Sequence, residues 1–248
     1  MAFNGKNVLI TGASMGIGEA IARKAAAEGA NLALFAQSEI SRSSIQARRS
    51  FKAIDLQSYE TVEKAVKETV KELGDIDILV NNAGLALGAP AAFPDLKVSD
   101  IVTSNSTNIN GLMFVTYVVL NSSMMRRKEG TILNVTSVTG FEVPPFPGEA
   151  VYHSNKAAQE AFTNALRNEL TGTNIRVLAL RPGVVATNFH SLRVGNDDKM
   201  QLESDDIAGA AIYMLSQPLN IPVKALDVVP SAQKSLNVID RSWSERNR

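Results

Sequence analysis

A tyrosine and a lysine, Tyr152 and Lys156, stand four residues apart in a segment with helical periodicity. That spacing places two side chains on the same face of a helix. A free phenol, with a pKa of about 10, is a poor proton donor or acceptor at neutral pH. A neighbouring ammonium stabilises the phenolate and brings the pKa of the phenol toward the operating range. The pair is therefore suited to moving a proton to or from a substrate oxygen.

A serine, Ser137, stands at the end of a run that is predicted to be a strand. At the carboxyl end of a parallel strand, a side chain opens into the crevice where ligands bind. A hydroxyl there can hydrogen-bond a substrate oxygen and stabilise developing charge. Taken singly, each feature has an ordinary explanation, such as a lysine beside a half-buried tyrosine or a serine that closes a strand. Their order along the chain favours a catalytic site.

A glycine-rich turn near the N-terminus predicts a dinucleotide-binding site. Glycines at positions 12, 16 and 18 lie between a predicted strand and a predicted helix. They allow a tight turn, close backbone approach to a pyrophosphate, and close packing of helix on strand. The free N–H groups and the dipole at the start of the helix then favour phosphate charge. The alternative explanation of the three glycines is an ordinary turn.

The end of the second predicted strand indicates which dinucleotide would bind. An acidic residue there would bond the adenosine ribose hydroxyls and repel a 2′-phosphate. Gln37 and Ser38 are neutral, and Glu39 lies one position further along. The sequence therefore predicts NADP, with NAD less favoured, although the nearest arginine is Arg42.

The elements that position these residues alternate along the whole chain. Short apolar runs, rich in β-branched residues, alternate with segments of helical periodicity, which predicts a parallel sheet covered by helices on both faces. We expect one doubly wound, Rossmann-like α/β domain over residues 1–248 with a seven-stranded sheet. The predicted strands are 8–11, 32–36, 51–54, 76–80, 131–135, 175–180 and 225–229, and the predicted helices are 18–28, 59–73, 99–125, 150–170 and 205–215. Substrate loops are predicted near 140–149 and 190–203.

Composition argues against several other classes of function. Lys+Arg and Asp+Glu number 25 each, so no net charge attracts nucleic acid or an anionic membrane. The chain has no cysteine and only two histidines, so neither a disulfide framework nor a metal site is predicted. The N-terminus lacks an apolar signal core, and no apolar run approaches the length of about 18 residues that a membrane span needs. We expect a cytoplasmic protein with no nucleic-acid or membrane partner.

Together, the motifs resemble those of the classical short-chain dehydrogenase/reductase family, from about residue 5 to about residue 230. Besides the glycine turn, the serine and the tyrosine–lysine pair, an Asn-Asn-Ala-Gly motif at 81–84 follows the fourth predicted strand. A Pro-Gly stretch at 182–187 follows the sixth, and Asp55 and Leu56 fall where the family contacts adenine. The C-terminal portion resembles a subgroup of NADP-linked reductases and dehydrogenases of small hydroxy acids and related carbonyl compounds.

The resemblance implies an NADP(H)-dependent oxidoreductase that interconverts a ketone or aldehyde and an alcohol by hydride transfer. Tyr152 would be the acid and base, Lys156 would hold the nicotinamide ribose, and Ser137 would position the substrate oxygen. Asn108 would hold a water that links Lys156 to solvent, and Asn110 is the rival for this place. The implied cofactor-binding residues are Gly12, Ser14, Met15, Gly16, Ile17, Gly18, Gln37, Ser38, Asp55, Leu56, Asn82, Ala83, Gly84, Tyr152, Lys156, Pro182, Gly183, Val185 and Thr187.

Two other functions fit the same motifs. One is a non-catalytic NADP-binding redox sensor or scaffold that kept the fold, although such proteins are expected to lose a proton-transfer residue. The other is a lyase or isomerase that uses Tyr152 and Lys156. The family resemblance also implies a homotetramer or homodimer. The apolar stripe Leu112, Val115, Val119 and Leu120 fits either a subunit interface or burial within one subunit.

Overall fold

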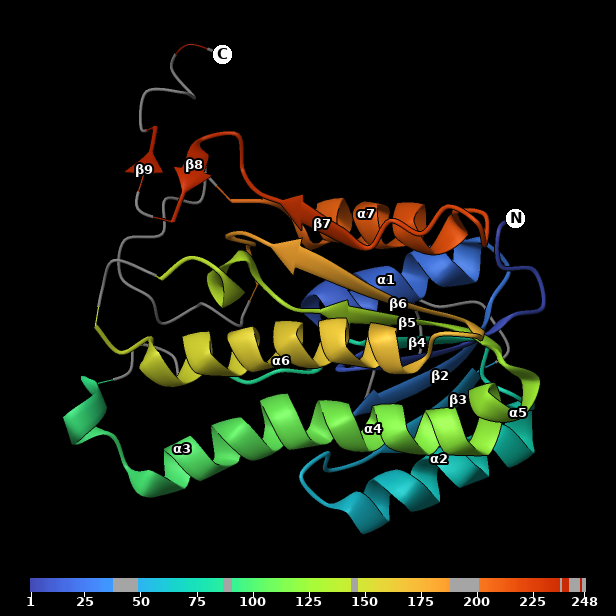
Figure 1. Cartoon of the computed structure of the whole chain (residues 1–248). Helices are drawn as coiled ribbons and strands as arrows, with labels where there is room; N and C mark the ends of the chain where they lie inside the picture. Colours follow the sequence, from blue (N-terminus) through green and yellow to red (C-terminus); the bar gives the residue numbers. More distant parts are fainter. Residues whose placement is uncertain are drawn as a thin grey trace.

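Seven parallel strands form the sheet, in the order β3-β2-β1-β4-β5-β6-β7 (Figure 1). The computed structural model describes residues 1–37, 49–86, 91–143, 147–187, 201–236, 238–240 and 246. The chain builds outward from β1 in one direction and from β4 in the other, which confirms the predicted doubly wound, Rossmann-like domain. The strands are β1 (Asn7–Thr11), β2 (Asn31–Ala36), β3 (Arg49–Ala53), β4 (Ile78–Asn81), β5 (Glu129–Val135), β6 (Asn174–Pro182) and β7 (Ala225–Val228).

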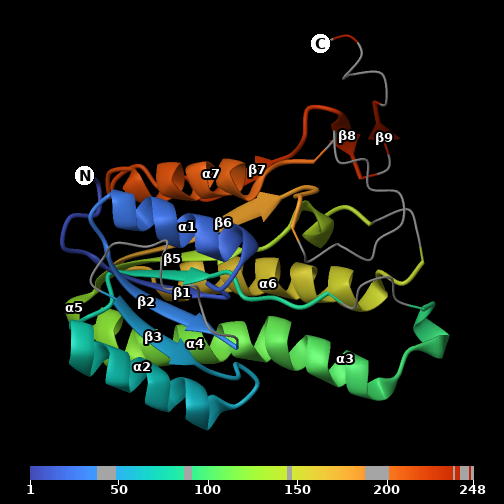
Figure 2. The same ribbon diagram turned by 180° about the vertical axis from the view of Figure 1, so that it is seen from behind.

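Alternate residues of each strand face opposite layers of helices, because successive side chains of a strand point to opposite faces. In β1, Val8 and Ile10 lie in the core beneath α1 and α7, whereas Leu9 lies in the core beneath α2, α4 and α6. The two layers lie on opposite faces of the sheet (Figures 1 and 2). These helices are α1 (Gly16–Ala27), α2 (Tyr59–Leu73), α4 (Leu112–Val119), α6 (Ala150–Glu169) and α7 (Ser204–Ser216).

One long helical segment after β4 carries the predicted catalytic asparagine. It begins as α3 (Val98–Asn105) and passes through a π-helical stretch, η2 (Ser106–Gly111), into α4. A second π-helical stretch, η3 (Leu120–Met124), leads to α5 (Met125–Arg127). The sequence predicts a single helix in this region, and the structure adds two widened turns to it. Single π-turns within helices are frequent at functional sites.

Shorter elements lie between and after these units. They are two 3₁₀ turns, η1 (Phe93–Asp95) and η4 (Val138–Gly140), and two antiparallel strands, β8 (Gln233–Ser235) and β9 (Val238–Ile239). Within the two predicted substrate loops, residues 144–146 and 190–200 lie outside the described residues. Across the described parts of the chain, no helix is both long enough and apolar enough to span a bilayer.

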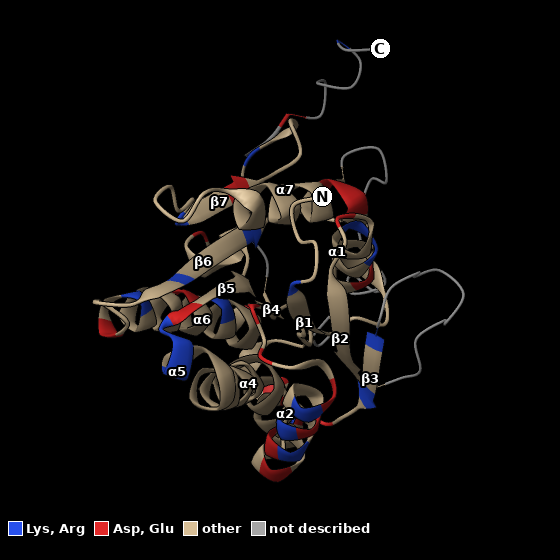
Figure 3. Cartoon of the chain, turned by 90° about the vertical axis from the view of Figure 1, so that its right-hand side faces the viewer, with Lys and Arg blue, Asp and Glu red and all other residues tan. Residues whose placement is uncertain are grey.

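Acidic and basic residues are interspersed along α2 (Figure 3). Glu63 and Lys67 pair there across one helical turn, with 3.0 Å between carboxylate oxygen and Nζ. The opposite face of α2 buries Val62, Ala65 and Val66. The helix is therefore amphipathic, with its apolar side against the sheet and its charges in water.

Candidate active site

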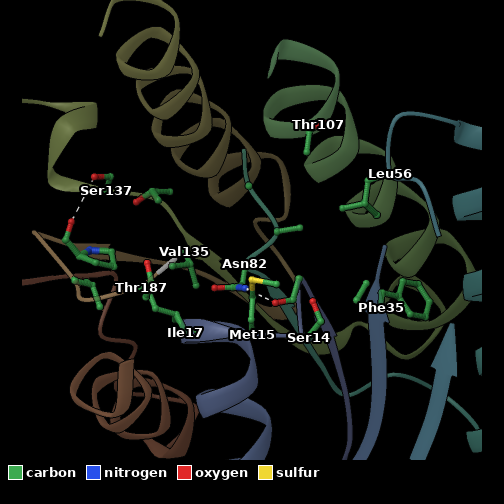
Figure 4. A pocket seen from close by; sticks show the side chains of 18 of the residues that line it. Ser14, Met15, Ile17, Phe35, Leu56, Asn82, Thr107, Val135, Ser137 and Thr187 are labelled. Carbon is green, nitrogen blue, oxygen red and sulfur yellow. Dashed lines mark hydrogen bonds between the residues drawn. The ribbon is translucent and has the colours of Figure 1, made fainter. Parts of the chain in front are cut away.

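A cavity of about 370 Å³ lies at the carboxyl ends of the central strands. It is lined by the turn between β1 and α1, by the segments that follow β4 and β5, and by the end of β6. In an open α/β sheet, ligands bind outside the carboxyl ends of the strands where the strand order reverses. Figure 4 shows Ser137 toward one side of this cavity, and Phe35 and Leu56 toward the other.

The glycine turn is shaped by backbone geometry that other residues adopt only with strain. Gly12 and Gly16 have φ angles of 66° and 59°, in the left-handed region. A β-carbon on Gly12 would lie 2.8 Å from Ala83 Cα. A β-carbon on Gly18 would lie 2.2 Å from the Gly12 carbonyl oxygen and 2.4 Å from Asn82 Nδ2. Two of the glycines therefore serve the contact between the turn and the Asn-Asn-Ala-Gly motif.

Hydrogen bonds join these two motifs into one unit. Asn82 Nδ2 donates to the carbonyl oxygens of Thr11 and Gly12, both at 3.1 Å. Thr11 Oγ1 accepts from the backbone N–H groups of Asn82 and Ala83, at 3.1 and 3.0 Å. The segment after β4 thus fixes the conformation of the turn that begins α1.

The start of α1 offers donors to an anion. Met15 is the N-cap residue and supplies no side-chain hydrogen bond to the first turn. Gly16 and Ile17, the first residues of the helix, line the cavity. The first N–H groups of a helix have no partner within the helix, and its dipole adds partial positive charge there. The glycine cradle and these N–H groups fit the pyrophosphate of a dinucleotide.

The far side of the cavity is mostly apolar. Phe35, Ile54 and Leu56 line it, together with Gln37, which directly follows β2. Such a surface is suited to an adenine ring. Asp55 is exposed, its carboxylate accepts from the backbone N–H of Gln57 at 3.0 Å, and it does not line the cavity.

The predicted proton-transfer pair lies on α6, one helical turn apart. Lys156 Nζ lies 5.7 Å from the centroid of the Tyr152 ring, and both residues line the cavity. Ser137 Oγ lines it too, accepts from the Thr139 N–H at 3.2 Å and donates to the Pro182 carbonyl at 3.4 Å. The ends of β5 and β6 are thereby tied together beside Tyr152 and Lys156.

The Lys156 ammonium is buried, with 4% of the residue exposed. Burial lowers the pKa of Lys156 to about 8, and the charge of nearby Glu160 opposes this shift. Lys156 Nζ donates to the Val135 carbonyl at 3.2 Å and to Gln159 Oε1 at 3.1 Å. At neutral pH the group is therefore still a cation.

Asn108 lies behind the cavity wall, in the π-helical stretch η2. Its Oδ1 accepts from the Leu85 N–H at 2.7 Å and its Nδ2 donates to the Leu85 carbonyl at 2.8 Å. Its own backbone carbonyl accepts from Gln159 Nε2 at 2.7 Å. The side chain of Asn108 therefore anchors the strand-to-helix segment after β4, and its carbonyl faces α6.

Most of the residues predicted for the site line the one cavity. They are Gly12, Ser14, Met15, Gly16, Ile17, Gln37, Leu56, Asn82, Ala83, Gly84, Ser137, Tyr152, Lys156, Pro182, Gly183, Val185 and Thr187. Gly18, Asp55 and Asn108 do not line it, and Ser38 lies outside the described residues. Gly18 lies beneath the turn because its missing side chain lets helix and turn touch.

Further lining residues were not predicted from the sequence. They are Phe35, Ala36, Ile54, Thr107, Val135 and Thr136. Phe35 and Ala36 are the last residues of β2, Val135 is the last residue of β5, and Thr136 follows it. The rule that ligands bind at the carboxyl ends of strands could have identified these four residues. Thr107 adjoins Asn108 in a π-turn, so its position depends on a widened helix that periodicity does not reveal.

The chain belongs to the short-chain dehydrogenase family, whose model, described as short chain dehydrogenase, matches residues 6–196. The resemblance noted from the motifs and the class of enzyme that it implies are thereby confirmed.

Individual relatives cover nearly the whole chain. The chain is 35% identical to sulfoacetaldehyde reductase 2 of Chromohalobacter salexigens, with 94% of this chain and 98% of the relative covered. It is 34% identical to the NADP-dependent 3-hydroxy acid dehydrogenase of Schizosaccharomyces pombe, with coverages of 96% and 97%. The closed form of a serine dehydrogenase complexed with NADP+ superposes with a TM-score of 0.82 at 30% identity, covering 92% of this chain and 96% of that one.

Proposed function

We propose that the protein is an NADP(H)-dependent oxidoreductase that interconverts a ketone or aldehyde and an alcohol by hydride transfer. The observation that carries the proposal is a single cavity that contains both the glycine turn and the three side chains suited to proton transfer, Ser137, Tyr152 and Lys156. A cofactor held at the turn and a substrate held at these side chains would therefore share one site.

NADP is proposed over NAD on two grounds. Gln37, which directly follows β2 and lines the cavity, is neutral, whereas an acidic residue there would repel a 2′-phosphate. The yeast relative is named as NADP-dependent, and the similar serine dehydrogenase holds NADP+. When bound, the nicotinamide would supply or accept the hydride.

The protein's own residues would orient the substrate and move the proton. Ser137 Oγ would donate a hydrogen bond to the carbonyl oxygen of the substrate, and the Tyr152 hydroxyl would give that oxygen a proton as the alcohol forms. In oxidation, Tyr152 would take the proton back. The Lys156 ammonium, 5.7 Å from the Tyr152 ring, would stabilise the phenolate left by this transfer.

The substrates are proposed to be small hydroxy acids and related carbonyl compounds. The support is the naming of the relatives, which include a sulfoacetaldehyde reductase, a 3-hydroxy acid dehydrogenase and a serine 3-dehydrogenase of Agrobacterium fabrum. A homo-oligomer, which the family resemblance implies, and the expected cytoplasmic location are part of the same proposal.

The first experiment is a fluorescence titration of the protein with NADPH and with NADH, followed by a screen of small carbonyl compounds. We expect NADPH to bind more tightly and at least one carbonyl compound to be reduced. Tyr152→Phe removes the transferable proton, and general acid catalysis by one group is worth about 100-fold to 10,000-fold in rate. We expect kcat to fall by that factor while the dissociation constant for NADPH changes less than about threefold.

Three outcomes would overturn the proposal. Normal turnover by Tyr152→Phe would remove the assigned acid and base. Tight binding of NADPH without turnover of any carbonyl compound or alcohol would favour the non-catalytic alternative, and conversion without net NADPH consumption would favour a lyase or isomerase.

A further inference from the structure

Gln159 lies one turn after Lys156 on α6, and only 2% of the residue is exposed. A buried side-chain amide is costly unless its polar atoms are paired. Both polar atoms of Gln159 are paired, and both partners belong to the environment of the proposed proton-transfer site. The sequence motifs do not single this residue out.

The amide of Gln159 spans two elements. Its Oε1 accepts from Lys156 Nζ at 3.1 Å, and its Nε2 donates to the Asn108 backbone carbonyl at 2.7 Å. Asn108 in turn fixes Leu85 through two hydrogen bonds. A continuous chain of hydrogen bonds therefore runs from the ammonium of Lys156 to the segment that follows β4.

We infer that Gln159 is a positioning residue for Lys156: its amide joins the ammonium directly to the Asn108 carbonyl, in the place where a linking water was expected. The inference rests on the proposed function, because it concerns how the proposed lysine is held. An amide neither ionises nor readily passes a proton at neutral pH. Gln159 thus holds the cation without adding charge, and with Val135 it accepts two of the three ammonium hydrogens.

The charged and titratable groups around Lys156 are few among the described residues. Glu160 and Tyr152 face it from its own helix. From β6, Arg181 pairs with Glu160 at 2.9 Å and offsets that carboxylate. β5 and η2 present uncharged groups, the Val135 carbonyl and the Asn108 carbonyl behind the Gln159 amide. Gln159 is therefore the neutral side chain whose removal should change the protonation of Lys156 most directly.

The test measures Lys156 itself in the protein without cofactor. Lysine labelled with ¹³C at Cε is followed by NMR against pH, and the Lys156 signal is assigned by its loss in Lys156→Met. Gln159→Met keeps the side-chain length but removes the acceptor, so we expect the titration midpoint of Lys156 to fall by about one pH unit. Gln159→Glu places an anion at the same position, so we expect the midpoint to rise by at least about one unit.

Asn155→Leu is the matched control. Asn155 is also a buried amide on α6, but its Nδ2 donates to Ser104 Oγ at 2.8 Å instead of contacting Lys156. We expect this variant to lose stability without moving the Lys156 midpoint. An equal shift in Asn155→Leu would overturn the inference, as would unmoved midpoints in the folded Gln159 variants. If Gln159→Met does not fold, the upward shift in Gln159→Glu decides the question.

Turnover provides a second readout that separates this inference from the proposed function. If the wild type reduces a carbonyl compound, we expect Gln159→Met to lower kcat about tenfold and to shift the pH profile of kcat. An unchanged pH profile of kcat in Gln159→Met would overturn the role inferred for Gln159 but would leave the proposed function standing. If the wild type reduces nothing, the proposed function fails, while the NMR titration still tests how Lys156 is held.

Discussion

Burial lowers the pKa of Lys156 from 10.5 to about 8. Between these two pH values the unfolded chain holds a proton at this residue that the folded protein has released. The free energy of unfolding therefore rises with pH between these two values. Below this window Lys156 is charged in the folded protein, and burying that charge lowers the free energy of unfolding. At pH 7 that cost is about 3 kcal/mol.

We predict that Lys156→Met stabilises the cofactor-free protein at pH 7 by about 1–3 kcal/mol, because an apolar side chain avoids the desolvation cost. The lower part of the range allows for the hydrogen bonds lost at Val135 and Gln159. Urea unfolding at pH 7 and at pH 10 measures the effect, and the gain should shrink by about 2 kcal/mol at the higher pH.

Lys64→Met, at an exposed position on α2, is the control and should change the free energy of unfolding by less than about 0.5 kcal/mol. A Lys156→Met protein that is less stable than the wild type at both pH values would show that its hydrogen bonds outweigh the cost of burial.

The sequence predicts the reactive pair of Tyr152 and Lys156 but not Gln159, the side chain that holds the lysine. Tyr152 and Lys156 are separated by one helical turn, a relation that periodicity alone predicts. Gln159 looks like any polar residue on a helix, because its partner Asn108 comes from another element and the contact depends on packing. The three glycines were expected to combine a tight turn, approach to the pyrophosphate and close packing, and the geometry gives Gly18 the packing role, since an added β-carbon would meet the Gly12 carbonyl oxygen.

At the scale of elements, α1 and the turn before it depend on the absence of a side chain at Gly18. A methyl group there would meet backbone at 2.2 Å, so helix and turn would have to separate. We predict that Gly18→Ala lowers the free energy of unfolding by about 1–3 kcal/mol and weakens NADPH binding at least tenfold. Thermal unfolding and fluorescence titration measure the two effects.

Gly209→Ala is the matched control, since Gly209 is an exposed residue of α7 with nothing within 4 Å of an added β-carbon. We expect this variant to gain about 0.5–1 kcal/mol, because alanine is the better helix former. Equal behaviour of the two variants would contradict the packing role of Gly18.

The strands and outer helices could be predicted from the sequence because their spacing of apolar residues reflects which side chains are buried. The run of β1 is buried throughout, and a strand covered on both faces reads as an unbroken apolar segment. The π-helical stretch Ser106–Gly111 could not be predicted, because the spacing of apolar residues does not distinguish a widened turn from a regular α-helical one. The short strands β8 and β9 have too few residues for any pattern to emerge.

At the scale of the whole molecule, apolar side chains remain on the surface of a single chain. Leu112, Val115, Val119 and Leu120 are buried within the subunit, so this stripe is not an exposed face. Val98, Val102 and Tyr117 on α3 and α4 are more than half exposed, as are Tyr213, Leu219 and Ile221 in and after α7. Contiguous apolar patches commonly mark contact surfaces, whereas singly scattered apolar residues are ordinary on a surface.

Because the family resemblance implies a homodimer or homotetramer, we predict that sedimentation will give the mass of two or four chains of 26.6 kDa. Val102→Asp together with Tyr117→Glu should lower that mass if α3 and α4 lie in the contact. The charge change Lys64→Glu on α2 should leave it unaltered. A wild-type protein that sediments as one chain would contradict the prediction.

The strand order has a consequence for how the chain is made. β1 leaves the ribosome first, yet it pairs with β4, Val8 lying against Ile78, and α1 packs against α7 near the other end of the chain. At roughly 5–20 residues per second, α7 emerges about ten seconds or more after α1. Throughout that interval the nascent chain carries apolar surface whose partners do not yet exist. The segment that holds the glycine turn is thus made first but gains its last packing partner near the end of synthesis. It is therefore the part of the nascent chain that is exposed to other chains for the longest time.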